Sequence, residues 1–142
     1  MIRSYKTQVT WLKGHWGELA CSNGPHMKFS APPSLQGYPD VLTPEDAFVA
    51  SVNICVHMMF IWSAEKYKID LVSYVCEAEG FAEDLIDRTS HFSRIILRSK
   101  ITARNTTRDK VEKAIKSSLK YSLIVNSIKS AVIVEPQIYI EE

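Results

Sequence analysis

Apolar and polar residues alternate at the start of the chain, which is typical of a β-strand. Between residues 4 and 12, one side of the pattern is polar, and the other carries Tyr5, Thr7, Val9 and Trp11. This period of two predicts a half-buried strand. The next segment, residues 15–29, contains the pair Asn23-Gly24, both of which tolerate positive φ, so it predicts a β-hairpin.

A long helical pattern follows, from Pro44 to about Lys66. Thr43 is a natural N-cap, and proline suits the first helical position. One predicted apolar face holds Phe48, Val52, Cys55, Met59 and Trp62, and a second holds Ala47, Ala50, Ile54, Met58 and Ile61. Since apolar residues lie on both sides, the pattern predicts a central and mostly buried helix.

Alternation returns in residues 69–80 and 91–103, which predict two adjacent antiparallel strands. The expected inward residues are Val72, Tyr74, Cys76 and Ala78 in the first and Ile95, Leu97 and Ile101 in the second. A second helix is predicted from near Thr107, with an inward stripe that ends at Ser122 and a solvated side of four lysines. A last strand is predicted over Ala131 to Ile140, where Pro136 favours an edge position.

This order of strands and single long helices predicts an α+β fold, with the strands packed on a long central helix and a second helix beside it. The chain has 142 residues and shows neither a repeat nor a linker. We therefore expect a single domain over residues 1–142.

Charge and hydropathy limit the classes of partner. The formal net charge is +1, so no strong field draws the protein to nucleic acid or to an acidic lipid surface. The N-terminus has no apolar signal core, and the longest apolar run, Ala47 to Trp62, is shorter than the roughly 20 residues of a membrane span. We expect a cytoplasmic protein with no membrane partner.

The three cysteines, Cys21, Cys55 and Cys76, form neither a CxxC motif nor a zinc pattern with histidines. We expect no metal and no cofactor. An odd number of cysteines in a cytosolic chain favours free thiols, of which one can be reactive.

The stretch from Thr43 to Cys55, in which Pro44-Glu45 precedes a small and apolar helix that reaches a cysteine, resembles the family of osmotically inducible protein C (OsmC) and the organic hydroperoxide resistance (Ohr) proteins. The order of elements agrees with that family over nearly the whole chain. The resemblance implies an intertwined homodimer with sites at the subunit interface. It also implies that Cys55 attacks a peroxide and becomes a sulfenic acid, which a second cysteine then resolves.

The sequence departs from the family pattern in two places. Ser122 stands at the position of the resolving cysteine, and a hydroxyl group cannot close a disulfide. The family also implies an arginine in the N-terminal strands that assists the thiolate and pairs with Glu45, but no arginine lies between Lys13 and Tyr38.

Each candidate residue also has a structural interpretation. Free cysteines such as Cys55 are often buried core residues. Glu45 can simply stabilise the helix, because its negative charge lies near the positive end of the helix dipole. Ser51 lies one turn before Cys55 and is a candidate donor to its sulfur. His57 lies about 200° around the helix from Cys55, so a core or interface role is favoured. Met59 lies one turn after Cys55. Ser51, His57 and Met59 are the candidate pocket residues.

Two functions from different classes remain open. The first is a stress-response enzyme, a thiol-dependent peroxide reductase in which Cys55 and Glu45 are catalytic and an external thiol is the reductant. The second is a non-catalytic protein that binds a small molecule or a thiol ligand, with Cys55 lining a pocket at the dimer interface. A purely structural oligomer explains Cys55 and Asn53 less well.

Overall fold

The computed structural model describes residues 1–142, which form two compact units, Met1–Phe48 and Val49–Glu142. The first unit holds a three-stranded antiparallel sheet in the order β1-β2-β3. Its strands are β1 (Thr7–Lys13), β2 (Trp16–Cys21) and β3 (His26–Ser30), followed by the short 3-10 helix η1 (Pro33–Leu35). The predicted hairpin is confirmed, although only Gly24 of the Asn23-Gly24 pair has a positive φ, at 117°.

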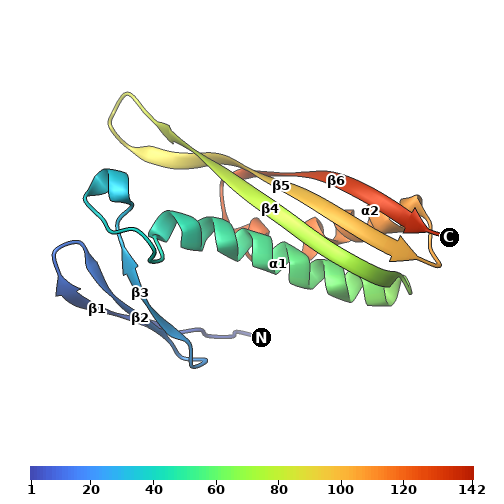
Figure 1. Ribbon diagram of the computed structural model, residues 1–142, viewed down its shortest axis with the longest axis horizontal. Helices are drawn as coiled ribbons and strands as arrows, with labels where there is room; N and C mark the ends of the chain where they lie inside the picture. The colour runs from blue at the N-terminus through green and yellow to red at the C-terminus, as the bar shows by residue number, and fades with distance from the viewer. The chain divides into compact units, whose positions relative to one another are not determined.

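The helix α1 (Pro44–Lys66) begins in the first unit and continues into the second. The Thr43 hydroxyl accepts a hydrogen bond of 3.0 Å from the Asp46 N–H, which confirms the predicted N-cap. The second unit adds the strands β4 (Asp70–Asp84), β5 (Ser90–Arg104) and β6 (Ala131–Glu141) and the helices α2 (Arg108–Tyr121) and η2 (Val125–Ser127). Two long helices and two sheets make the fold α+β, as predicted (Figure 1).

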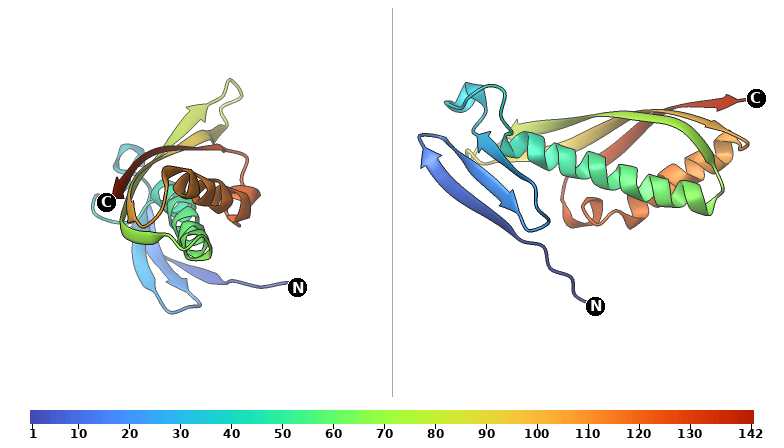
Figure 2. Two further views of the ribbon diagram at one scale, coloured as in Figure 1. Left: turned by 90° about the vertical axis from the view of Figure 1, so that its right-hand side faces the viewer. Right: turned by 60° about the horizontal axis from the view of Figure 1, so that its bottom comes forward.

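The sheet of the second unit has the order β4-β5-β6. β4 pairs with β5 antiparallel, whereas β6 pairs with β5 parallel, so α2 serves as the crossover between two parallel strands. β6 is an edge strand, as Pro136 predicted. Figure 2 shows α2 and the part of α1 in this unit on the same face of the sheet.

The core of the second unit lies between that sheet face and the two helices. It joins Phe60 of α1, Ile101 of β5, Val111 of α2 and Ile138 of β6, all at most 5% exposed. A Cβ atom on Gly80 of β4 would lie only 2.7 Å from Cγ2 of Val49. Glycine at this position therefore lets α1 approach the sheet closely.

Only one face of α1 is buried within the chain, which corrects the predicted mostly buried helix. The buried residues recur every four positions and are Val52, Val56, Phe60 and Ala64. Several residues of the two predicted apolar faces are exposed, namely Ile54, Met58 and Trp62. The sequence could not show which side faces the core, since both are apolar.

Two predictions of burial in the strands are also wrong. All of β1 is exposed, including Val9 and Trp11, so the predicted half-burial is absent from the single chain. Val72 is exposed because β4 has an irregularity between Leu71 and Ser73 that shifts its register with β5.

The helix α1 has the bounds that the sequence predicted, Pro44 to Lys66. By length and composition alone it could cross a membrane, since its 23 residues contain a window with a mean hydropathy of 1.6, which corrects the expectation that the apolar run is too short. The core helix of a soluble protein has the same properties, and α1 contributes the apolar core residues described above.

Candidate functional site

The candidate nucleophile, Cys55, contacts Ser122. Cys55 lies in the middle of α1 and is half-buried, while Ser122 is the fully buried residue that ends α2. The Ser122 hydroxyl donates a hydrogen bond of 2.9 Å to the Cys55 sulfur. The structure thus brings together two predicted site residues from different helices of the second unit.

Ser122 is held in a fixed orientation by the turn that follows α2. Its Oγ accepts a hydrogen bond of 3.3 Å from the N–H of Val125, and its carbonyl accepts one of 3.0 Å from the N–H of Asn126. Because Oγ accepts from one side, its own proton points to the Cys55 sulfur. A donated hydrogen bond is strongest when its acceptor carries negative charge, so this geometry suits a thiolate. The sequence carries no signal for the contact of Val125.

Glu45 lies in the first turn of α1, ten residues before Cys55. Its Oε2 atom is buried and has no hydrogen-bond partner. A buried carboxylate oxygen normally finds a donor, because removing it from water is costly. The unpaired atom agrees with the absence of an arginine from residues 14–37, and it leaves Glu45 open to a cationic group.

Ser51 and Met59 lie one turn before and one turn after Cys55 on α1, and both are half-buried. Their spacing places them on the same side of the helix as the thiol. Their predicted roles around a bound ligand remain predictions.

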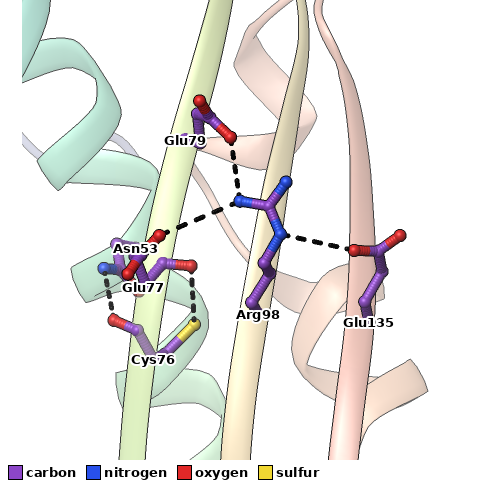
Figure 3. Close-up of polar contacts among 6 residues, drawn as sticks. All are labelled: Asn53, Cys76, Glu77, Glu79, Arg98 and Glu135. Carbon is purple, nitrogen blue, oxygen red and sulfur yellow. Dashed lines mark hydrogen bonds and ion pairs between the residues drawn. The ribbon is translucent and has the colours of Figure 1, made fainter.

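His57 lies on a different side of α1, against β4. Its ring is 4.6 Å from the ring of Tyr74, centroid to centroid, and its Nδ1 atom is buried without a partner. Asn53, one turn earlier, donates a hydrogen bond of 3.2 Å to the carbonyl of Cys76 (Figure 3). The structure therefore places His57 with the Tyr74 and Cys76 region, as the helical angle predicted, and not beside Cys55.

The Cys76 thiol is unsuited to serve as a nucleophile. Burial raises the pKa of Cys76, because a charged sulfur would lose its hydration there. The pKa of the neighbouring Tyr74 is also raised, chiefly by burial and then by the charge of a Cys76 thiolate. Both groups are therefore neutral at physiological pH, and Cys76 stays a thiol.

A polar cluster covers the opposite face of the sheet. Arg98 of β5 contacts three carboxylates at 2.9, 3.9 and 3.5 Å, contributed by Glu79, Glu77 and Glu135 in that order (Figure 3). These side chains are exposed to solvent, so the pairs contribute little to stability individually. No group of three or more His, Cys, Asp or Glu side chains is arranged to hold a metal ion.

Comparison with known proteins adds an independent line of evidence. The family model of the OsmC-like protein matches residues 37–137, which is more than half of the chain. No curated protein sequence matches the chain.

Solved structures share the fold over nearly the whole chain. An OsmC-like protein of unknown function from Vibrio cholerae is 20% identical, with a TM-score of 0.87 over 96% of this chain and 100% of that one. An OsmC-like protein from Mycoplasma pneumoniae is 12% identical, with a TM-score of 0.84 over 98% and 99%. An organic hydroperoxide resistance protein from Elizabethkingia anophelis is 16% identical, with a TM-score of 0.77 over 99% of each chain. From the family match, with this shared fold beside it, we conclude that the chain belongs to the OsmC-like protein family.

Proposed function

We propose that this protein is a thiol-dependent hydroperoxide reductase whose nucleophile is Cys55. The Cys55 thiolate attacks the terminal oxygen of a hydroperoxide ROOH, the O–O bond breaks, and the alkoxide takes a proton to leave as ROH. Cys55 becomes a sulfenic acid. Two molecules of an external thiol R′SH then restore it: the first forms a mixed disulfide and releases water, and the second releases R′SSR′ and returns the Cys55 thiol.

The hydrogen bond from Ser122 to Cys55 is the observation that carries this proposal. A buried hydroxyl group whose lone pair is engaged by the Val125 N–H directs its proton at a half-exposed sulfur. Such a donor stabilises negative charge on the sulfur, both before attack and as the sulfenate forms. The shared fold with organic hydroperoxide resistance proteins supports the choice of substrate class.

An external reductant is required because serine occupies position 122. A hydroxyl group cannot condense with a sulfenic acid to form a disulfide, so the chain offers no internal disulfide for a carrier to reduce. Cys76 does not replace it, since its raised pKa disfavours the thiolate that would have to attack. Small thiols remain reduced in the cytoplasm, so this dependence fits a cytoplasmic protein.

The test is peroxide consumption by the purified protein with cumene hydroperoxide and an external thiol. We expect Cys55→Ser to abolish enzymatic turnover, while Cys76→Ser keeps the wild-type rate. Cys76→Ser is the matched control, because it removes one half-buried thiol of the same unit. Equal rates for the wild type and Cys55→Ser would overturn the proposal.

A second candidate function is the binding of a small ligand without turnover, with Cys55 lining the site. The unpaired Oε2 atom of Glu45 favours it, because the activating cation that the family resemblance implies is missing from this chain. Intact-mass measurement of the protein as isolated tests this function. A thiol adduct that Cys55→Ser lacks, together with no peroxide turnover, would favour binding.

We also propose that two copies of the chain pair through α1. Ile54 and Trp62 are 62% and 56% exposed on this helix, and Met58 is exposed between them. A row of large apolar residues on one helix is typical of an interface rather than of a solvated surface. Pairing would bury this row.

A further inference from the structure

A basic groove lies between the end of α1 and the length of α2. Its volume is about 330 Å³, and it is lined by four lysines and two tyrosines, namely Lys66, Lys113, Lys116, Lys120, Tyr67 and Tyr121. No carboxylate lines it, although Asp109 pairs with Lys113 at 3.2 Å. The net charge of the whole chain is only +1, so this positive charge is a local concentration.

The groove and the candidate site share the C-terminal end of α2. Tyr121 lines it and directly precedes Ser122, whose hydroxyl contacts the Cys55 sulfur. At 1.5 Å per residue, Lys113 lies about 12 Å from Tyr121 along α2, and Lys66 lies about 16 Å from Cys55 along α1. Measured along the helix axes, the lysines therefore lie no more than about 16 Å from Tyr121 or Cys55.

We propose that this groove binds the phosphate groups of the thiol that reduces oxidised Cys55. The inference rests on the proposed function and names the class of reductant: a phosphorylated thiol with a long neutral arm between sulfur and phosphate. Its sulfur attacks the Cys55 sulfenic acid and displaces water, which forms a mixed disulfide. A second molecule of the same thiol attacks that disulfide, which releases the symmetrical disulfide and restores the Cys55 thiol.

Three features of the groove select this class. Lysine ammonium groups are flexible point charges that bind phosphate, and four of them suit more than one phosphate group. The rings of Tyr67 and Tyr121 offer flat apolar contact to the uncharged part of a ligand. The groove extends over only about 12 Å of α2, and the chain lacks the wider positive charge that a nucleic acid needs.

The test uses two thiols that share one thiol arm. Coenzyme A carries phosphates and an adenosine group at the far end of the arm, while pantetheine has the same arm without them. We expect the KM for coenzyme A to be at least about tenfold lower than that for pantetheine at low salt. In the variant Lys113→Gln/Lys116→Gln/Lys120→Gln, we expect the two KM values to converge while kcat is unchanged. The control Lys100→Gln/Lys110→Gln/Lys129→Gln makes the same change in net charge outside the groove. It should keep the difference between the KM values for coenzyme A and pantetheine.

Direct binding separates this inference from the proposed function. Calorimetric titration of the Cys55→Ser protein with coenzyme A requires no turnover, and we expect binding that weakens with salt and with the groove variant but not with the control variant. Binding that fits this pattern supports the groove even if peroxide turnover is absent. Equal KM values for the two thiols in an active enzyme, or binding that the groove and control variants weaken equally, would overturn the groove and leave the reductase intact.

Discussion

Ser122 and Cys55 are separated by 67 positions in the sequence, yet the Ser122 Oγ and the Cys55 Sγ lie 2.9 Å apart. α1 supplies the sulfur, and the end of α2 supplies the hydroxyl group. The contact stands where the OsmC/Ohr resemblance implies a pair of cysteines. The resemblance therefore implies that a hydrogen bond stands here in place of a redox pair.

Ser122→Cys should restore an internal disulfide. A sulfur at this position would lie within reach of Cys55, so one equivalent of hydroperoxide should convert both thiols to a disulfide. Thiol titration, and mass spectrometry of the cross-linked peptide that joins position 122 to Cys55, measure this. The control Ser127→Cys, on the exposed η2 turn, should keep its added thiol free. Two remaining free thiols at positions 55 and 122 after oxidation would contradict the prediction.

Ser122→Ala should slow the oxidation of Cys55 by about tenfold or more, because a hydrogen bond to a charged group contributes roughly 1.5–3 kcal/mol. It should also lower the free energy of unfolding by about 1–2 kcal/mol, since the Val125 N–H loses its acceptor. Stopped-flow oxidation and urea unfolding measure the two effects. Ser118→Ala is the matched control: this buried serine bonds its own helix at Ile115, and its loss should leave the oxidation rate unchanged.

The raised pKa of Cys76 predicts a pH dependence of stability. Its pKa in the folded state lies above the ordinary value of 9.0, because burial penalises the thiolate. The unfolded chain therefore loses this proton first as pH rises. The stability that the neutral Cys76 thiol contributes to the folded state is complete below about pH 9. It is lost as pH passes the pKa of Cys76 in the folded state. Urea unfolding between about pH 8 and 11 should show that the free energy of unfolding falls more steeply with pH in the wild type than in Cys76→Ser. An equally steep fall in both proteins would contradict the prediction.

Trp62→Glu should weaken the proposed pairing of two copies, because a charged side chain would be buried in the apolar interface. We expect the dissociation constant to rise by about tenfold or more, measured by light scattering over a dilution series. Val75→Glu is the control. Val75 is 66% exposed on the outer face of the sheet, and its change should not alter the molecular mass in solution.

Arg98→Met should lower the melting temperature slightly at low salt, because Glu77, Glu79 and Glu135 then repel one another without a central cation. The difference from the wild type should shrink in about 1 M NaCl, where exposed charges are screened within roughly 3 Å. Calorimetry at two salt concentrations measures it. Lys100→Met, on the same strand, should lower the melting temperature less. If Arg98→Met lowers the melting temperature equally at both salt concentrations, lost packing and not charge would be responsible.

The bounds of the elements could be predicted because they depend on local signals. Thr43 caps α1, Pro136 marks an edge strand, and alternation marks β4 and β5. The buried face of α1 could not be predicted, because Ile54 and Trp62 are as apolar as Val52 and Phe60. The exposure of Val72 follows from a strand irregularity that alternation does not show.

The candidate site was predictable only where the family resemblance guided it. The resemblance paired position 122 with Cys55, whereas no periodicity in the sequence relates two residues so far apart. Val125, whose backbone N–H orients the Ser122 hydroxyl, carries no sequence signal of its own. Such contacts depend on how the helices pack, which is a property of the whole fold.

Under the proposed function, the serine at position 122 would also limit how long each molecule stays active. Without a neighbouring sulfur to trap it, each Cys55 sulfenic acid would wait for a reductant from solution. During that wait a further peroxide molecule can convert it to a sulfinic acid, which thiols do not reverse. The ratio of peroxide to reductant would then decide how many turnovers each molecule completes before it is permanently inactivated.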